Sequence, residues 1–353
     1  MQDIINVFDQ SMLEDRDGQP FDREDNRLIP PLRNLKPKIC LGMTLHNAAR
    51  FLPEAIESLL NQTYEDFTLL AFDDASTDET GSIVKNYARQ DSRIKYHRNP
   101  RNLGMIDNHR LAFKTAQQTV KGLDYFGWAG DHDIWLPDWL RAHVETLNEN
   151  PNVVLTYPLA VPIGIDGEEL SATFPKFDNS GMNKSERIRA ACLKMKGAGN
   201  MVYGLYRAEA LAKTSVFPRC MHSDRVLMLQ LSVHGTFKNI ETPLWRRRYV
   251  DNNPWGSDGP VLSYEQWSDR QRPRVFNGNP PWYSHFPILS HAWILIFSLS
   301  IRPRGGDYVN LHWGLLMACL HLSRRRAHLR QDLRIVVKKV LSKLKLISYQ
   351  LPR

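Results

Sequence analysis

Cysteines are scarce in this sequence, and their spacing shows no pattern. Its 353 residues include only Cys40, Cys192, Cys220 and Cys319, and no two of them form a CxxC pair. This argues against a zinc knuckle or a disulfide framework and is typical of proteins from a reducing compartment. The acidic N-terminus, MQDIINVFDQSMLEDRDGQPFDRED, has no apolar segment like that of a secretory signal. We therefore expect a cytoplasmic location.

Long hydrophobic runs and glycine-rich phosphate motifs are missing as well. The apolar stretch FPILSHAWILIFSLSI (286–301) has 16 residues, whereas a membrane-spanning helix needs roughly 20. This predicts a buried or interfacial helix. No GxGxxG follows the first predicted strand, and the P-loop pattern GxxxxGKS/T occurs nowhere. A Rossmann dinucleotide site and a P-loop are therefore disfavoured.

Positive charge is concentrated in the C-terminal part of the chain. The net charge is +8, but residues 301–353 contain 12 Lys or Arg and 2 Asp or Glu, which leaves −2 for the first 300. From 324 to 347, apolar residues recur every three or four positions, with basic residues mostly around the other face. Such a helix suits an anionic membrane surface, or else packs on the protein with a solvated basic face. No motif that reads DNA or RNA accompanies the charge, so we expect no nucleic-acid partner.

Residues 38–158 alternate short apolar runs with helical patterns. The apolar runs predict strands over 38–44, 67–74, 93–99, 124–130 and 152–158, and the segments between them predict helices over 50–62, 76–91, 104–119 and 136–150. Alternation of this kind predicts an α/β fold with a twisted, mostly parallel sheet flanked by helices. An irregular arm over residues 1–37 precedes it.

The alternation ends after residue 158. The later segments predict a hairpin around Asp166-Gly167, helices over 185–195 and 223–235, and strands over 199–207, 236–241 and 243–250. We expect one domain over 38–250, with halves 38–158 and 159–250. A loop-rich, then helical and basic region covers 251–353.

Polar clusters follow the predicted strands at Thr44–Asn47, Asp73–Asp74, Asn99–Asn102 and Asp131–Asp133. Any one of them could be an ordinary polar loop, but open parallel sheets bind ligands at the carboxyl ends of their strands. The two acids after the second strand could accept hydrogen bonds from a base or a ribose. The carboxylates of GDHD suit Mg²⁺ or Mn²⁺, and Mn²⁺ tolerates the imidazole better.

These motifs resemble those of family 2 glycosyltransferases, which have the GT-A fold. The segment KICLGMTLHNAARFLPEAIESLLNQTYEDFTLLAFDDASTDET (38–80) is similar to their opening. RNPRNLGMIDNH, WAGDHDIWLPDWL, SDRVLMLQLSVHG and LWRRRY resemble their later motifs in the same order. The resemblance extends over about residues 38–250.

The resemblance implies a role for each matching residue. It assigns the nucleoside to Thr44, Asn47, Asp73 and Asp74, the donor pocket to Asn102 and Asn108, the diphosphate and its metal ion to Asp131 and Asp133, the acceptor proton to Asp224, and phosphate pairing to Arg247 and Arg248. Such an enzyme would use Mn²⁺ or Mg²⁺. Direct attack on the anomeric carbon would invert the configuration of the sugar.

The metal segment departs from the family, which commonly has adjacent acids where this chain has His132-Asp133. In that register His132 takes the ligand position and Asp131 is incidental. If Asp131 and Asp133 are used instead, His132 is a bystander. A second departure is His46, at a position where tyrosine is frequent.

Each residue also has a structural interpretation. Asp73 and Asp74 could cap the next helix, and Asp224 could be an N-cap only. The arginines at 246–248 could line an exposed strand edge, and the tryptophans at 128, 135 and 139 are expected in the core.

The resemblance, together with the basic C-terminal segment, implies an inverting transfer of a sugar from a nucleotide-diphosphate sugar to a glycan or lipid-linked acceptor. The setting would be surface polysaccharide or glycolipid assembly, on the cytoplasmic face of a membrane. The alternative is a catalytically degenerate GT-A protein that acts as a sugar-nucleotide-binding or scaffold subunit.

Overall fold

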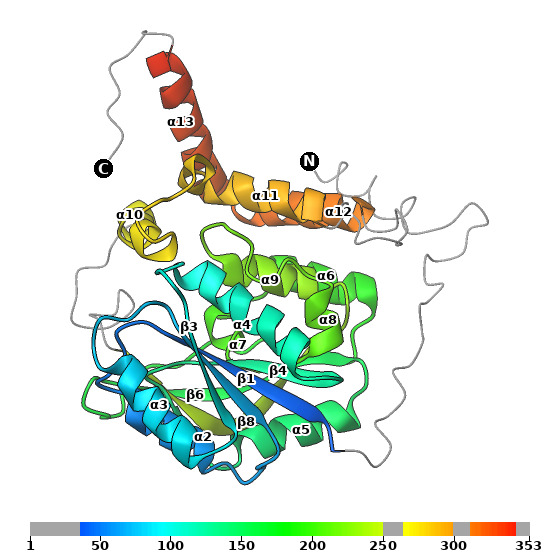
Figure 1. The fold of residues 1–353 in the computed structure, drawn as a ribbon. Helices are drawn as coiled ribbons and strands as arrows, with labels where there is room; N and C mark the ends of the chain where they lie inside the picture. The colour runs from blue at the N-terminus through cyan, green and yellow to red at the C-terminus, as the bar shows by residue number, and fades with distance from the viewer. Residues whose placement is uncertain (1–35, 250–263, 299–310, 344–353) are drawn as a thin grey trace. The chain divides into compact units, whose positions relative to one another are not determined.

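The computed structural model describes residues 36–249, 264–298 and 311–343 (Figure 1). The predicted arm over residues 1–37 lies outside this part of the chain, except for its last two residues. The last four residues of the predicted basic segment, 344–347, also lie outside it.

An eight-stranded sheet with the order β3-β2-β1-β4-β7-β6-β8-β5 forms the centre of the fold. Its strands are β1 (Lys38–Leu45), β2 (Thr68–Asp73), β3 (Ile94–Arg98), β4 (Leu123–Ala129), β5 (Ile134–Trp135), β6 (Val153–Ile163), β7 (Leu205–Arg207) and β8 (Thr236–Arg248). The strands β3, β2, β1 and β4 are parallel, as the alternating pattern predicts. In the second half β6 and β8 are parallel, while β7 and β5 run antiparallel to their neighbours. The α/β fold is confirmed, with a sheet that is parallel on one side and mixed on the other.

Two local predictions in the second half were wrong. The predicted strand 199–207 is a strand only over its last three residues, because a short helix, α7 (Ala198–Met201), follows Gly197 in the left-handed conformation. The two predicted strands over 236–250 form the single strand β8, whose pairing with β6 shifts register near Pro243. The strand β6 also continues past residue 158, where the two halves were expected to divide.

Helices cover both faces of the sheet (Figure 1). On one face lie α2 (Leu52–Leu60), α3 (Thr80–Gln90) and α5 (Trp139–Glu149), which contribute to the main apolar core. On the other face lie α4 (Met105–Thr119) and α8 (Ala208–Ala212). The remaining helices before residue 249 are α6 (Lys184–Leu193) and α9 (Ser223–Leu231).

The sequence of β1 explains this arrangement. Leu41 and Met43 point to the core beneath α2, as the period-two alternation of a strand requires. Gly42 points to the other face. A Cβ atom there would lie 2.9 Å from Phe126 Cζ and 3.1 Å from Ala112 Cβ, so its absence lets α4 pack close to the sheet.

The expected core positions of the tryptophans are confirmed. Trp128, Trp135 and Trp139 are all buried. The Trp135 ring stacks on Trp245 at 5.5 Å and contacts Trp139 edge-on at 4.8 Å. This aromatic cluster packs β5 and β8 against α5 and fixes the segment that follows Asp133.

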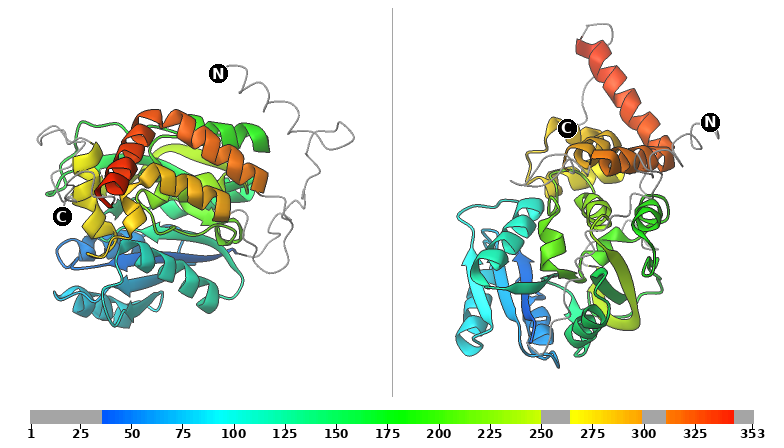
Figure 2. Two further views of the ribbon diagram at one scale, coloured as in Figure 1. Left: turned by 90° about the horizontal axis from the view of Figure 1, so that it is seen from above. Right: turned by 90° about the vertical axis from the view of Figure 1, so that its right-hand side faces the viewer.

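The C-terminal region is helical, as predicted. It contains α10 (Tyr264–Val275), the 3₁₀ helix η1 (Trp282–His285), α11 (Pro287–Ser298), α12 (Leu311–Arg324) and α13 (Arg326–Lys343). Figure 2 shows α11 and α12 side by side. They are antiparallel, since Gly314 lies against Leu295 and His321 lies against His291.

The α11–α12 pair packs on α6 and α9. Arg324 Nη1 donates hydrogen bonds to the carbonyl oxygens of Cys192, at 3.2 Å, and Met195, at 3.1 Å, and these carbonyls lie at the C-terminal end of α6. The predicted interfacial stretch therefore has one face against the body of the protein. Among the described residues, no helix has the length and apolar character needed to cross a membrane.

Candidate functional site

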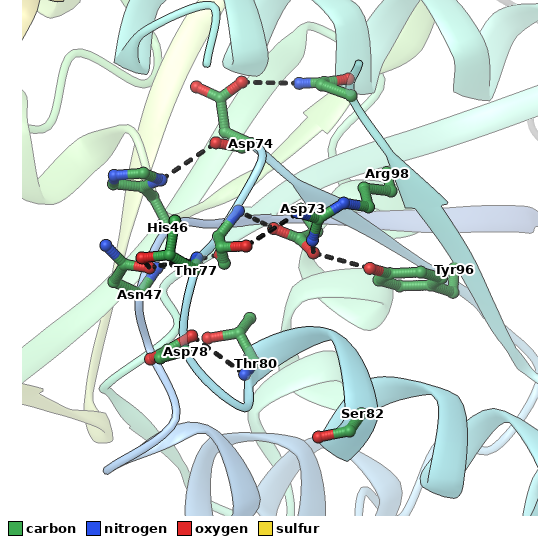
Figure 3. A network of polar contacts seen from close by, with 12 residues as sticks. His46, Asn47, Asp73, Asp74, Thr77, Asp78, Thr80, Ser82, Tyr96 and Arg98 are labelled. Atoms are coloured by element: carbon green, nitrogen blue, oxygen red, sulfur yellow. Dashed lines mark hydrogen bonds and ion pairs between the residues drawn. The ribbon is translucent and has the colours of Figure 1, made fainter. Parts of the chain in front are cut away.

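Asp73 ends β2 with a fully buried carboxylate (Figure 3). Its Oδ1 accepts a hydrogen bond from the Ser76 backbone at 2.8 Å, and its Oδ2 accepts one from Tyr96 Oη at 2.6 Å and one from Arg98 Nη1 at 2.7 Å. Burial raises the pKa of this carboxyl, but the hydrogen bonds and the charge of Arg98 outweigh it, and the pKa is lowered overall. Asp73 is thus ionised and stabilises the turn between β2 and α3.

Asp74 holds a different loop, the one that precedes α4. Its Oδ1 accepts from Asn99 Nδ2 at 2.8 Å and from the Leu103 N–H at 2.7 Å, and its Oδ2 accepts from the Gly104 N–H at 2.9 Å. Asn108 is buried behind this loop and donates to the Phe72 carbonyl at 3.1 Å. Neither acid caps α3. At the start of that helix, Asp78 Oδ1 instead accepts a hydrogen bond from the Thr80 N–H.

The loop after β1 is tied to the turn after β2. Asn47 has a positive φ of 50°, and its Oδ1 accepts from the Thr77 N–H at 2.8 Å. In return, the Asn47 N–H donates to Ser76 Oγ at 3.0 Å, and the next N–H donates to Thr80 Oγ1 at 2.8 Å. These bonds, drawn in part in Figure 3, fix the two loops as one rigid edge.

His46 and Asn47 form the exposed part of this edge, with Thr44 and Asn102 half-buried beside them. His46 Nδ1 lies 3.0 Å from the Asp74 carbonyl oxygen, so this nitrogen carries the proton. Its Nε2 lies 3.2 Å from Asn102 Nδ2, which can donate to it. An imidazole and two amides therefore lie at the surface of this edge, while the two acids are buried beneath them.

The second group of sequence-predicted residues follows β4. Asp131 Oδ1 lies 2.5 Å from His132 Nδ1, and His132 Nε2 lies 3.9 Å from Asp133 Oδ1. Burial lowers the pKa of His132, but the two flanking carboxylates outweigh it and raise the pKa to about 9. Burial raises the pKa of Asp133, against the charges of His132 and Arg247.

Asp133 and Arg248 lock this segment from inside. Asp133 is buried, and its Oδ1 accepts the Arg248 backbone N–H at 2.9 Å. The Arg248 guanidinium donates to the carbonyls of His132 at 3.0 Å and Ile165 at 2.9 Å, and it pairs with Glu54 at 2.5 Å. All three of its nitrogens are used, so it offers no open fork to a phosphate.

The charges of four side chains act on the phenol of Tyr203. Burial is the main cause that raises the pKa of Tyr203 to about 12. The charges of Asp133, Asp131 and Asp224 also raise this pKa, and the charge of Arg247 lowers it. The four groups therefore lie in the neighbourhood of Tyr203, although they are far apart in the sequence. The region joins the β4 segment, the end of β8 and the start of α9.

Asp224 belongs to this region through α7. It lies in the first turn of α9, where the N-cap is His222, so the prediction that Asp224 is merely the cap is not what the structure shows. A Cβ atom on Gly199 would lie 3.4 Å from Asp224 Oδ2. The next residue, Asn200, accepts a hydrogen bond from Arg247 Nη1, which links the base candidate to β8.

Arg247 is the arginine of β8 that faces the region. Its guanidinium lies 5.7 Å from the Trp245 ring centre and 5.4 Å from that of Tyr249. Because successive strand residues alternate, Trp245, Arg247 and Tyr249 share one face, and Arg248 points to the other. The two arginines that the sequence grouped together therefore have different surroundings.

The two groups lie at one edge of the sheet. Leu45 is paired with Asp73 across β1 and β2, and Met43 is paired with Ala129 across β1 and β4. These three strands are parallel, so their carboxyl ends meet there. Asp74 and Asp131 follow on the two sides of the end of β1.

The exposed part of the second group offers two side chains that could hold a divalent cation. Among the described residues no three His, Cys, Asp or Glu side chains gather as a metal site, but cations that bind nucleotides take few protein ligands because phosphates and waters complete the shell. Asp131 and His132 have side chains 19% and 34% exposed. This mixed oxygen and nitrogen pair suits Mn²⁺ better than Mg²⁺.

Comparison with known proteins agrees with this geometry. Residues 40–199 match the family model described as glycosyl transferase family 2.

This segment is a family 2 glycosyltransferase domain.

Relatives of the domain include an uncharacterized glycosyltransferase of Haemophilus influenzae, 30% identical over 117 residues, or 33% of this chain and 35% of that protein. The putative glycosyltransferase EpsE of Bacillus subtilis is 37% identical over 120 residues, or 33% of this chain and 41% of that protein. The chain thus matches less than half the length of these relatives. The crystal structure of S. aureus TarS 1–349 in complex with UDP-GlcNAc has a TM-score of 0.50 and 17% identity, and covers 89% of this chain and 93% of that chain. This likeness shows that the chain has the GT-A fold.

The structure places two residues near this candidate site that the sequence analysis missed. Tyr203 and Asn200 were predicted within a strand, so the hydrogen bond of Asn200 with Arg247 and the charges around Tyr203 were not expected. Asn200 had one signal, because it follows glycines and breaks the apolar pattern of a strand. Tyr203 had none, since its position depends on the turn after α7.

Proposed function

We propose that this protein transfers a sugar from a nucleotide-diphosphate sugar to a hydroxyl of a glycan or lipid-linked glycan, with inversion at the anomeric carbon. The observation that supports this most is the closeness of Asp224 to the Gly199–Asn200 segment that binds Arg247, in a region where the charges of Asp131 and Asp133 also act on Tyr203. This region lies at the strand edge where the family 2 domain also presents His46 and its neighbours. An acid for the acceptor and charges for the leaving diphosphate are thus adjacent.

The nucleoside would bind at the surface formed by His46, Asn47 and Asn102. In this proposal Asp73 and Asp74 act one layer below, because each is buried with both carboxylate oxygens already accepting hydrogen bonds. They would hold the two loops at the spacing that a base and ribose require. Asn108 would support the same loop from behind.

The diphosphate would lie against Asp131, His132 and Arg247. A bound Mn²⁺ or Mg²⁺ would stabilise the negative charge that develops on the leaving nucleoside diphosphate. Asp131 and His132 would hold that cation, which replaces the imidazole proton. Arg247 would donate to phosphate oxygens with the nitrogens that Asn200 does not occupy, and Asp133 and Arg248 would keep the segment in place.

Asp224 would accept the proton of the acceptor hydroxyl as its oxygen attacks the anomeric carbon. Its carboxylate is half-buried at the start of α9 and is bordered by Gly199, which leaves room beside it. The attacking oxygen forms the new glycosidic bond while the bond to the diphosphate breaks. No covalent enzyme intermediate is required, so a single displacement inverts the configuration.

Binding of nucleoside diphosphates with Mn²⁺ tests the donor site. UDP is the first probe, followed by GDP, ADP and dTDP, in thermal unfolding with and without the cation. At a hundredfold excess over Kd, a ligand stabilises the fold by about 2.7 kcal/mol. We expect that stabilisation in the wild type, with its Mn²⁺-dependent part lost in the Asp131→Asn, His132→Ala double variant.

Asp166→Asn is the control, since this carboxylate is exposed in the turn after β6. It should keep the full shift. If no nucleoside diphosphate stabilises the wild type with Mn²⁺, the proposal is wrong. Binding without any release of nucleoside diphosphate from sugar donors in the presence of acceptors would instead support a non-catalytic binding subunit.

We further propose that the protein acts at an anionic membrane surface on the cytoplasmic side, where a lipid-linked acceptor would be found. On α13, Arg326, Arg330 and Arg334 are exposed at spacings of four, beside Leu333 (47% exposed) and Val337 (54% exposed). Arginines next to apolar side chains suit a lipid interface. Arg324 is not part of this surface, because it bonds to α6.

Replacement of these three arginines by glutamine should weaken binding to vesicles that contain phosphatidylserine. Each basic residue near such a surface contributes on the order of 1 kcal/mol, so we expect about a hundredfold loss at low salt. The variant Arg110→Gln, Lys114→Gln, Lys121→Gln removes the same charge from α4 and its end and should bind almost as well as the wild type. Equal losses in both variants, measured by vesicle sedimentation, would contradict the proposal.

A further inference from the structure

The turn that carries Asp224 has an unusual backbone. His222 precedes α9 with a positive φ of 52° and a ψ of 45°, in the left-handed region. A residue with a Cβ atom rarely adopts this conformation unless its surroundings hold it there. Met221 and Ser223 on either side of it are buried. The position of Asp224 thus depends on whatever fixes this turn.

Two buried histidines from the C-terminal helices reach the turn. His291 on α11 places Nε2 at 2.6 Å from the Met221 carbonyl oxygen. Its Nδ1 lies 3.2 Å from Nε2 of His321 on α12. Each histidine is 1% exposed. The contacts form a chain from α12 through α11 to the backbone next to His222.

The direction of each hydrogen bond follows from elementary chemistry. A carbonyl oxygen can only accept, so His291 Nε2 carries a proton and donates it to Met221. Burial lowers the pKa of His291 to about 3 and that of His321 to about 2, so both rings are neutral. His291 Nδ1 is therefore bare and accepts, and His321 Nε2 is the donor. One tautomer of each ring satisfies the whole chain.

The α12 end of this series of hydrogen bonds is attached to the body of the protein. Arg324 follows His321 on α12 by three residues and bonds to the carbonyls of Cys192 and Met195 on the body. Gly314 lets α12 approach α11 closely at the other end of the pair, where a Cβ atom would lie 2.6 Å from the Leu295 carbonyl oxygen. Asp224 is close enough for its charge to act on His291. The helices thus hold the turn directly beside the candidate base.

We propose that His291 and His321 are positioning residues, which hold the Met221–Asp224 turn so that Asp224 reaches the acceptor hydroxyl. The proposal rests on the sugar transfer proposed above, because it assigns these residues to the base of that reaction. It makes the C-terminal helices part of the transfer site. Donor binding, at the opposite end of the site, does not depend on them.

The test compares two replacements of His291 in the full chain. His291→Leu removes the donor to Met221. His291→Gln keeps an N–H at a similar distance from the backbone. We expect kcat for transfer to fall about 10- to 100-fold in the leucine variant, as for other small displacements of a catalytic group, with the KM for the donor unchanged. The glutamine variant should recover most of the loss.

His143→Leu is the matched control for destabilisation. This histidine is also fully buried and neutral, but it bonds to Thr156 beneath α5. At equal folded fraction it should keep the wild-type kcat. A kcat loss in His143→Leu equal to that in His291→Leu, or no recovery in His291→Gln, would overturn the positioning role.

Two measurements without turnover keep the inference separate from the proposed function. Amide hydrogen exchange of residues 219–225 should accelerate in His291→Leu and not in His143→Leu. Nitrogen-15 spectra of the wild-type imidazoles at pH 6 should show both rings neutral with the proton on Nε2. An unchanged rate of amide exchange in His291→Leu would refute the proposed hydrogen bonds from His321 through His291 to Met221, even if the enzyme is active. A ring that is protonated, or that carries its proton on Nδ1, would refute them as well. If both hold and no transfer occurs, only the proposed function fails.

Discussion

Replacement of Asp224 by asparagine should lower kcat for sugar transfer by about 10³-fold, within the range for loss of a general base. The amide has nearly the same shape but does not accept a proton at neutral pH. The KM for the nucleotide sugar should change little. Asp224 lies on the α9 side of the site, whereas the proposed nucleoside-binding surface lies at the loops after β1 and β2. Steady-state kinetics with varied donor and saturating acceptor measures both constants.

Glu209→Gln is the control for this experiment. Glu209 also lies in the first turn of a neighbouring helix, α8, but it is exposed and pairs with Lys213. Both substitutions remove a negative charge near a helix N-terminus, which costs about 0.3–1 kcal/mol, so their stabilities should be similar. A kcat in Asp224→Asn within threefold of the wild type would exclude Asp224 as the base.

Replacement of Arg248 by methionine should destabilise the fold by about 3 kcal/mol or more, because buried carbonyls lose their donors. Methionine fills a similar volume but donates nothing to the backbone oxygens of His132, Gly164 and Ile165. Most of the loss comes from those carbonyls. The partner carboxylate of Glu54 is about half exposed, at 53%, so water can solvate it when the arginine is gone.

Arg246→Met is the matched control, two residues away on the same strand. Its side chain is 42% exposed and lies 3.4 Å from Glu169, which is 63% exposed. Such a surface pair contributes about 0–1 kcal/mol. Chemical denaturation at equal m-values should show a large midpoint shift for position 248 alone. Comparable shifts in the two variants would mean that the buried bonds of Arg248 do not stabilise the fold as argued.

The arginines of β8 illustrate the limit of sequence analysis at the site. RRR can be recognised as a basic segment of a strand, and alternation predicts that its middle residue faces away from its neighbours. The sequence does not show which face meets the site and which meets Glu54. That choice depends on β5 and β6, which pair with β8 from distant parts of the chain.

The acids show the same limit in another form. Asp73, Asp74, Asp131 and Asp133 were all expected near the ligand, and the strand pattern correctly placed them at one edge of the sheet. Only Asp131 among them is partly exposed. The others are buried and accept hydrogen bonds from β3, from β8 and from the loop before α4, and a local pattern carries no information about such partners.

The sequence by itself determined the order of the helices and of the longer strands up to residue 158, though not the short strand β5, as well as the buried tryptophans and the location of the polar clusters. Each of these follows from local periodicity and from the parallel direction of neighbouring strands. Only the tertiary structure decided which side chains are open to a ligand, bonded Asn200 to Arg247 beside Asp224, and set His291 against the turn before α9. Those contacts join residues far apart in the chain, and packing and hydrogen-bond satisfaction across the whole fold select them.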